Sequence, residues 1–330
     1  MRIVSARPRR TFGSRICASV SIFSIKSGIP TLSGPDMAFV KTWRNGTQEV
    51  YLPGSSLKGT LRSHAERIAR TLNQTAACDP FGKINDPHPF CGNVFEARKD
   101  GSDWPEREQR DKINRLVYHD SCPICRLFGS TWFAGRLATE DAYAVGNAPK
   151  PQQRDGVGID RFTGGAAQGV KFDLEVVTEA TFATRLHLRN FELWQLGLLG
   201  FVLNDFADGL IRIGAAKSRG LGRVRGEVKQ VRVDFLGPQA PQPQDGQLTF
   251  RGLGALATAA DVQAYGLAQP DEVTVPAPAA NPTSMPGLRQ TYVFDGGAFP
   301  WTALAPLWVA QATQYHVPDA MRAKRNGRPS

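Results

Sequence analysis

Residues 53–72 read PGSSLKGTLRSHAERIARTL, and the division of the whole chain follows from this stretch. Its apolar side chains recur every three or four residues, which is the spacing of one buried face of an α-helix. Serine side chains favour helix N-termini, so Ser55 or Ser56 is the expected N-cap. Lys58 and Arg62 lie one turn apart beside the apolar face. The residues of that face are Leu57, Leu61, Ala65, Ile68 and Leu72.

Outward from this helix, alternating apolar and polar residues predict strands. A first strand is expected at 16–25, with a loop from 27 to 53, and two strands of a half-buried antiparallel sheet at 170–176 and 180–188. Asn190 is the expected N-cap of a second helix that ends at Gly209, and a last strand lies within 221–235. The order strand, helix, two strands, helix, strand predicts an α+β protein with a ferredoxin-like βαββαβ unit.

Residues 77–165 show no sustained periodicity and contain four of the five cysteines. Such a segment is too long for a plain connection, so it is predicted to be an insertion with its own stabilising device. A C-x-x-C pair with two upstream cysteines suits tetrahedral zinc, which predicts a structural Zn²⁺ site. The alternatives are small buried hydrophobes and a redox pair. The candidate ligands are Cys78, Cys91, Cys122 and Cys125, with His88 or His119 as a substitute for one cysteine.

Charge and cysteine content limit the possible classes of function. Forty Lys and Arg residues against thirty Asp and Glu residues give a net charge of +10, which favours polyanionic partners. The apolar run 193–203 is interrupted by Gln195 and flanked by Glu192 and Asp205, so it does not predict a membrane span. Five cysteines with one C-x-x-C fit a reduced cytoplasmic chain better than a disulfide framework.

The start of the first helix also has the parts of an anion-binding site. Gly54 allows close approach of the backbone, the first N–H groups of a helix are free, and Ser55, Ser56 and Lys58 add hydroxyls and a positive charge. The same serines also fit an ordinary N-cap. A second glycine-rich stretch follows the second helix at 214–223, and two such stretches predict a track for phosphates. Its basic residues are Lys217, Arg219 and Arg223.

Four motifs in this order give the chain a family resemblance. They are PGSSLKG at 53–59, CPICRLFGS at 122–130, IDRFTGGA at 159–166 and GAAKSRGLGR at 214–223. Together they resemble the RAMP superfamily, and specifically the repeated backbone subunit of type III CRISPR antiviral effector complexes of the Csm or Cmr kind. The resemblance extends over residues 34–235, whereas residues 237–330 lie outside it and are expected to form a separately packed extension.

The resemblance implies a modified RRM-like or ferredoxin-like palm that binds CRISPR RNA (crRNA). Such subunits stack along the guide, contact single-stranded target RNA, and adjoin other effector subunits, including copies or paralogues of themselves. In the first-helix motif, Ser55, Ser56, Lys58 and Arg62 are implied to hold guide phosphates. Phe162 is implied to be a wedge between guide and target, or else an aromatic packed locally. The implied parts are a palm at 1–76 and 170–236, a zinc-binding insertion at 77–151, a thumb hairpin at 152–169, and an extension of unknown role at 237–330.

The resemblance also implies an endoribonuclease. In cleaving members, an Asp between the first strand and the first helix promotes metal-dependent cutting of target RNA, and here Asp36 occupies that loop. A carboxylate there can hold Mg²⁺ or Mn²⁺ while a 2′-hydroxyl attacks the phosphate. One alternative is a crRNA-binding scaffold without catalysis, in which residues 34–36 are merely a turn. Another is an endonuclease that processes repeat RNA, with His64 or His187 as general acid or base.

Overall fold

The computed structural model describes residues 38–44, 46–99, 101, 104–236, 240–278 and 289–322, together with the backbone of 19–21. The chain has a mixed α+β fold in which all strand pairs are antiparallel within these residues. Of the strand expected at 16–25, β1 (Ser19–Ser21) lies within the described residues, and Asp36 lies outside them. In the part of the chain described, no helix combines the length and the apolar character needed to cross a membrane.

Helix α1 (Gly54–Leu72) forms where the apolar spacing predicts it, and it buries Leu57 and Leu61. Burial of each leucine stabilises the fold by about 2 kcal/mol. The predicted N-cap is wrong, because the helix starts directly after Pro53 and neither serine caps it. Instead, the Gly54 N–H donates to Asp141 Oδ1 at 2.7 Å. The cap therefore comes from a distant segment of the chain.

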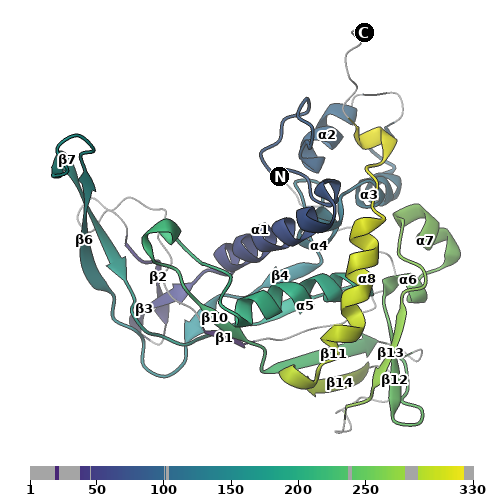
Figure 1. The fold of residues 1–330 in the computed structure, drawn as a ribbon. Coiled ribbons are helices and arrows are strands. Elements are labelled where there is room, and N and C mark those ends of the chain that lie inside the picture. Colours follow the sequence, from purple (N-terminus) through teal and green to yellow (C-terminus); the bar gives the residue numbers. More distant parts are fainter. Residues whose placement is uncertain are drawn as a thin grey trace.

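Short strands lie against the two long helices (Figure 1). One sheet has the order β2-β3-β5-β8, and two further pairs are β4 with β9 and β1 with β10. The hairpin β2–β3 is a correction, because its residues were expected to belong to a loop. The bounds are β2 (Lys41–Arg44), β3 (Thr47–Leu52), β4 (Leu137–Thr139), β5 (Ala142–Ala144), β8 (Phe182–Ala183), β9 (Leu186–Leu188) and β10 (Arg225–Glu227).

Helix α5 (Leu193–Ala207) is the second long helix of the expected order. Its N-cap is Glu192 rather than Asn190, and the Glu192 N–H donates to Gln195 Oε1 at 3.2 Å in a capping box. Asn190 has a φ of 49°, a left-handed turn conformation that asparagine tolerates, so it redirects the chain before the cap. The helix therefore begins three residues later than the asparagine that was expected to cap it.

A long hairpin, β6 (Gln152–Ile159) and β7 (Ala166–Val176), projects away from the helices, at the left of Figure 1. It spans the range expected for a hairpin and continues to Val176. Residues 170–176 therefore pair with β6 within this hairpin. They were expected to lie in one sheet with residues 180–188. Those later residues form β8 and β9, which pair with β5 and β4. Alternation identified the strands correctly but could not identify their partners.

The C-terminal residues are part of the main fold, and the expected separate packing is wrong. Strand β11 (Gln230–Leu236) pairs along its whole length with β14 (Arg289–Asp295). Helix α8 (Trp301–Thr313) packs on α5, where a Cβ atom on Gly197 would lie 2.4 Å from the Leu304 carbonyl oxygen. The remaining elements here are β12 (Gln247–Arg251), β13 (Glu272–Pro276), α6 (Leu253–Leu256) and α7 (Ala259–Tyr265).

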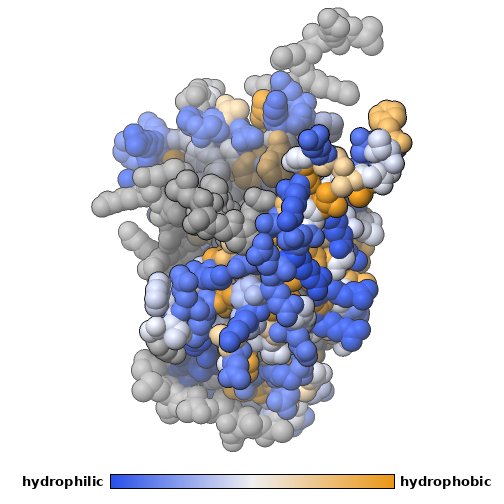
Figure 2. Space-filling model, turned by 90° about the vertical axis from the view of Figure 1, so that its left-hand side faces the viewer, coloured by the Kyte–Doolittle hydropathy of each residue, from blue (hydrophilic) through white to orange (hydrophobic). Residues whose placement is uncertain are grey.

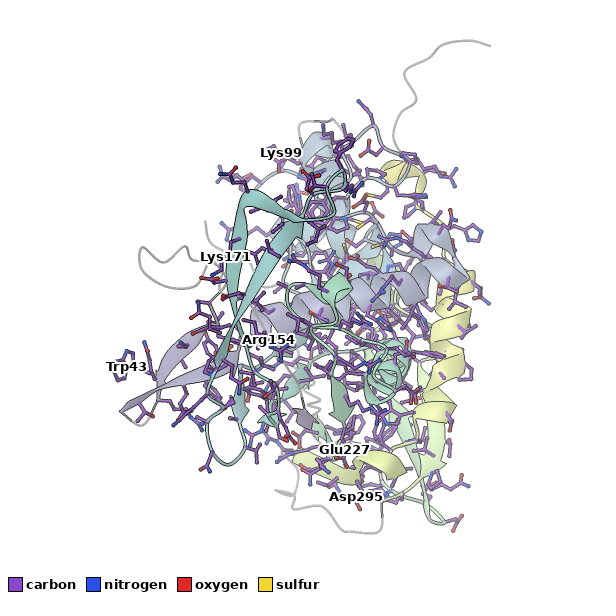
Figure 3. All side chains as sticks on the ribbon, turned by 60° about the vertical axis from the view of Figure 1, so that its left-hand side comes forward. Trp43, Lys99, Arg154, Lys171, Glu227 and Asp295 are labelled. Atoms are coloured by element: carbon purple, nitrogen blue, oxygen red, sulfur yellow. The ribbon has the colours of Figure 1, made fainter. Side chains whose placement is uncertain are left out.

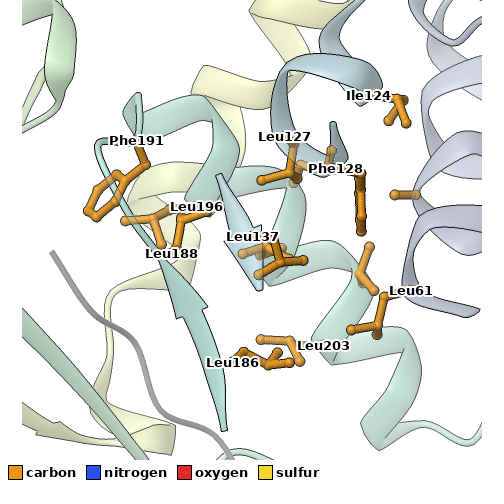
Figure 4. Packing of buried hydrophobic residues seen from close by; sticks show 14 of the residues in the cluster. Leu61, Ile124, Leu127, Phe128, Leu137, Leu186, Leu188, Phe191, Leu196 and Leu203 are labelled. Carbon is orange, nitrogen blue, oxygen red and sulfur yellow. The ribbon is translucent and has the colours of Figure 1, made fainter. Parts of the chain in front are cut away.

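The cysteine-rich segment shares the main hydrophobic core. It contains α2 (Cys91–Arg98), α3 (Arg110–His119) and α4 (Pro123–Phe128). Figure 4 shows the α4 side chains beside those of β4, β9, α1 and α5. Ile124 and Leu127 are fully buried, so this segment does not depend on a metal alone for its packing. The core in this view includes Leu61, Ile124, Leu127, Phe128, Leu137, Leu186, Leu188, Phe191, Leu196 and Leu203.

Candidate metal centre and nucleic-acid interface

Four cysteines from three separate stretches of the sequence come together beside α1. Their sulfur atoms all lie within 4.8 Å of one another, and all four residues are buried. Tetrahedral Zn–S bonds of about 2.3 Å place sulfurs about 3.8 Å apart, so this spacing suits zinc. The thiols are unpaired in the structure, and they can hold a metal ion such as zinc. The residues are Cys78, Cys91, Cys122 and Cys125.

The start of α4 favours thiolates at this centre. The Cys125 N–H donates to Cys122 Sγ at 3.4 Å, and the Cys122 N–H donates to Cys91 Sγ at 3.5 Å. Burial opposes ionisation of Cys122, but hydrogen bonds from the other three thiols hold its pKa well below the usual range. The bond with Cys122 in turn raises the pKa of Cys91. Without a cation, ionisation of Cys122 thus disfavours ionisation of Cys91. A bound cation would allow all four sulfurs to ionise.

Neither histidine joins the cluster of ligand atoms within the described residues. His119 Nδ1 lies 2.8 Å from Asp120 Oδ1, and its side chain is half exposed. His88 lines a cavity of about 710 Å³ beside the cysteines. Tyr315 and His316 line the same cavity. The ligand set that the fold brings together is therefore the all-cysteine one.

Arg62 points toward the metal centre, which differs from its implied role at guide phosphates. Its Nη2 donates to Cys125 Sγ at 3.5 Å, its Nη1 donates to the Gly129 carbonyl at 3.0 Å, and its Nε lies 3.0 Å from Glu66 Oε1. The side chain is 21% exposed. These contacts occupy the guanidinium, so Arg62 links α1 to the metal-binding segment and is poorly placed to contact RNA.

The two glycine-rich stretches lie side by side, and we call the depression between them the α1 groove. It has a volume of about 390 Å³. Hydroxyl groups on one wall, glycine backbone on the other and a lysine at the rim are the groups that bind phosphate in proteins. Its lining is Ser56, Gly59, Thr60, Ser63, Gly214, Ala215 and Lys217.

Lys58 lies in the first turns of α1, on the same helix as the groove. Burial, followed by the nearby charge of Arg62, lowers its pKa. None of the ion pairs between described residues includes Lys58. An anion beside Lys58 would therefore meet a charge that is not already neutralised. Ser55 is exposed at the helix start but does not line the groove.

The loop 214–222 has backbone conformations that explain its glycines. Gly222 has a φ of 76°, and a Cβ atom there would lie 2.1 Å from the Ile213 carbonyl oxygen. Lys217 is exposed at the start of a short 3₁₀ turn. The Arg219 guanidinium lies 4.8 Å from the centre of the Phe172 ring on β7. Arg219 thus connects this loop to the hairpin, whereas Lys217 faces the groove. Arg223 is also exposed, and its backbone forms an isolated antiparallel β-bridge with that of Arg212.

Phe162 lies at the tip of the β6–β7 hairpin and is fully exposed. The turn is closed by Asp160, whose Oδ1 accepts the N–H groups of Phe162 at 2.7 Å and Thr163 at 3.2 Å. The face of the molecule turned to the viewer in Figure 2 is mostly hydrophilic in its coloured part. A free aromatic ring is therefore unusual here, and the alternative of a locally packed ring is wrong.

Aromatic residues on the β2–β3 hairpin were not among the predicted site residues. Figure 3 shows Trp43 near the outer end of this hairpin, where its side chain is 73% exposed. On the other face of the strands, the Arg44 guanidinium lies 4.5 Å from the centre of the Tyr143 ring. The sequence signal was present, because Asn45-Gly46 is a typical two-residue hairpin turn between alternating residues.

The remaining candidates have the following surroundings. Asp36 lies outside the described residues; the Phe39 N–H shortly after it in sequence donates to Glu175 Oε2 at 2.8 Å. His64 is buried, its Nε2 donates to Asp205 Oδ2 at 2.6 Å, and Arg67 Nη2 donates to its Nδ1 at 3.0 Å. His187 lies on β9, and its Nε2 is 2.5 Å from Glu140 Oε1. Both histidines are engaged in contacts that join neighbouring elements.

Comparison with known proteins gives one family. The family model of the RAMP superfamily matches residues 25–225, which include α1, the cysteines, the β6–β7 hairpin and the loop 214–222. No significant match was found among curated proteins.

Proposed function

Because the chain belongs to the RAMP superfamily, we propose that it is a crRNA-binding backbone subunit of a type III CRISPR RNA-guided complex, and that it also cleaves target RNA. The superfamily is generally associated with CRISPR-related RNA binding, and some members are RNA endonucleases. In this proposal the partners are crRNA, single-stranded target RNA and other effector subunits, including copies or paralogues of this chain. The structural metal is zinc.

The observation that carries RNA binding is the α1 groove. Two stretches of sequence separated by well over a hundred residues contribute complementary groups to it, with hydroxyls from α1 and glycine backbone and Lys217 from the loop. Neutral donors and ammonium groups contact the phosphates of any sequence, as a guide with a variable spacer requires. The net charge of +10 agrees with a polyanionic partner.

The pairing of strands supports a palm of the ferredoxin-like kind. β1 pairs with β10 and β4 pairs with β9, both antiparallel, and α1 and α5 connect strands of these two pairs. A βαββαβ unit has these outer pairings. The projecting β6–β7 hairpin with exposed Phe162 supports the role of a thumb, because an unpacked apolar ring can insert between bases.

For cleavage, we assign Asp36 as the residue that holds Mg²⁺ or Mn²⁺. The ion would stabilise the charge that develops on phosphate during attack by the adjacent 2′-hydroxyl. A scaffold without catalysis is the second candidate function. Processing of repeat RNA is disfavoured, because His64 is buried between Asp205 and Arg67 and the Nε2 of His187 is engaged by Glu140.

The binding proposal is tested by the salt dependence of crRNA affinity. Lys58→Ala combined with Lys217→Ala should lower the slope of log affinity against log salt by about 1 to 2 units, given about 0.7 per phosphate contact on single strands. The control with the same change of charge is Lys112→Ala with Arg115→Ala, on the exposed face of α3. An unchanged slope in the first double variant would move the RNA track elsewhere.

The cleavage proposal is tested in the assembled complex. Asp36→Ala should abolish cutting of target RNA and leave guide and target affinity nearly intact. Cutting by the parent should stop with EDTA, and a deoxynucleotide at the scissile position should block it. If Asp36→Ala cuts at the parental rate, the chain is a scaffold or uses another carboxylate.

A further inference from the structure

A second, larger depression lies at the sheet β2-β3-β5-β8, and none of the roles above uses it. Its volume is about 730 Å³, within the range of about 300–1,000 Å³ that is typical of small-ligand sites. We call it the sheet pocket. Its lining combines one aromatic residue, three cations and two acids, which are Tyr143, Arg44, Arg185, Lys229, Glu140 and Asp141.

Tyr143 and Arg44 line one wall of the sheet pocket, and Tyr143 also contacts Tyr51, which is outside the lining. Tyr51 and Tyr143 are direct partners across β3 and β5, and their rings stack with centres 5.9 Å apart and planes 17° apart. The Arg44 guanidinium lies over the Tyr143 ring, with its central carbon 4.5 Å from the ring centre. Arg44 Nη1 lies 3.6 Å from Glu49 Oε2, and the Arg44 side chain is 45% exposed. The guanidinium is thus held between Tyr143 and Glu49 while part of the side chain faces solvent.

The other walls carry both signs of charge. Arg185 is exposed and has no ion-pair partner among the described residues, whereas Lys229 pairs with Glu227. Glu140 uses one carboxylate oxygen for His187, and Asp141 uses one for the Gly54 N–H. The second oxygen of each carboxylate has no hydrogen-bond donor within the described part of the chain. These groups offer cations to a phosphate and acceptors to an amino group.

We propose that the sheet pocket binds one unstacked nucleotide of single-stranded RNA, with its base stacked on the guanidinium of Arg44. Bases stack readily on arginine planes, and carboxylates accept hydrogen bonds from exocyclic amino groups. The phosphate lies toward Arg185 and Lys229. The inference rests on the proposed RNA-binding function and adds a second contact, on other elements than the α1 groove.

The mixture of positive and negative side chains in the sheet pocket favours a nucleotide over an acidic peptide. An acidic peptide would gain from Arg44 and Arg185 but would face Glu140 and Asp141, which repel it. A nucleotide places its negative charge at one end and its hydrogen-bond donors at the other. The arrangement therefore favours a base with an amino group, such as cytosine, over uracil, which has none.

The test uses fluorescein-labelled single-stranded RNAs of ten cytidines (C10) or ten uridines (U10), which have equal charge. Anisotropy is measured at one salt concentration with the full chain. Arg44→Ala should weaken C10 binding about fivefold or more, the lower end of the cost of losing one stacked base. C10 should bind more tightly than U10 to the parent, and Arg44→Ala should reduce this preference.

The chain offers a matched control in Arg115. Its side chain is 44% exposed, it lies 3.3 Å from Asp261, and its guanidinium lies 5.8 Å from the Tyr265 ring, on α3 and α7. Arg115→Ala should leave C10 affinity within twofold. Arg44→Lys keeps the charge but loses the plane, so it should resemble Arg44→Ala. Full affinity in Arg44→Lys would show that only charge matters and would overturn the inference.

Further outcomes separate this inference from the proposed function. If Arg44→Ala binds C10 normally while the Lys58/Lys217 variant is weakened, the sheet pocket is not an RNA site but the α1 groove stands. If the parent binds neither RNA, both fall. Displacement of C10 by hexaglutamate as effectively as by unlabelled C10 would assign the sheet pocket to an acidic protein partner, which also overturns the inference.

Discussion

Asp271 is a buried carboxylate that joins the C-terminal residues to the start of α5. It is 2% exposed, its Oδ1 accepts the Leu193 N–H at 2.8 Å, and its Oδ2 accepts the Gly254 N–H at 2.8 Å. Burial, and then the charge of Glu192, raises its pKa from 3.8 to about 7. The folded chain therefore keeps a proton on Asp271 at pH values where the unfolded chain has released it.

The sign of the pH dependence follows from this difference. Where the folded state binds more protons than the unfolded state, the free energy of unfolding falls as pH rises. The contribution of Asp271 is fully present below about pH 4 and is lost as pH rises through about 7. A shift of about three pKa units corresponds to about 4 kcal/mol, of which about 2 kcal/mol is lost between about pH 5 and pH 7.

The perturbation that tests this is Asp271→Asn, followed by urea unfolding at pH values from about 5 to about 8. Asparagine can still accept the Leu193 N–H, but its amide N–H group meets the Gly254 N–H. At about pH 5 the variant should therefore be less stable than the parent by about 1–3 kcal/mol. By about pH 8 the difference should close or reverse, because the variant has no buried charge.

The control is Asp245→Asn, which makes the same substitution at an exposed position. It should leave the pH slope of the parent nearly unchanged. Parallel stability profiles for the parent and Asp271→Asn across this pH range would refute the reasoning, because Asp271 would then titrate at its ordinary pKa in the folded chain.

The remaining predictions concern other parts of the fold. The parent purified without chelator should carry about one zinc per chain by metal analysis, and Cys122→Ser should fall below about half an equivalent. Gly197→Ala should lower the free energy of unfolding, measured by chemical denaturation, by about 1–2 kcal/mol, because the added Cβ atom meets the Leu304 backbone. The control is Gly200→Ala, whose Cβ atom meets only the Trp301 ring at 3.0 Å and which should be neutral in the same assay. Arg62→Ala should reduce zinc retention in the presence of a chelator without changing the salt slope of RNA binding. Phe162→Ala should leave the denaturation midpoint unchanged, because the ring is fully exposed.

The sequence predicts the features of the fold that depend on local spacing. The apolar period of α1 and the C-x-x-C pair each identify a structure within a few residues, and the cysteine cluster follows because soft ligands must converge. The position of the predicted catalytic Asp36 lies outside the described residues and stays a prediction.

Features that depend on distant residues could not be predicted from the sequence. The cap of α1 comes from Asp141, and nothing near Gly54 indicates this contact. Arg62 sits at a surface-like position beside the apolar stripe, yet Cys125 and Gly129 turn it inward. The partner of β11 arrives more than fifty residues later, after two segments rich in proline, which is why the C-terminal residues were expected to pack separately.

The pairing of β11 with β14 has a consequence for synthesis of the chain. Once residue 236 has left the ribosome, Val231, Val233 and Phe235 still have no partner strand, because residues 289–295 have not yet emerged. An apolar edge of this kind invites pairing with another nascent chain. Messages truncated before codon 289 should therefore yield aggregates rather than a smaller functional subunit, even though the cysteines and the α1 groove would all be encoded.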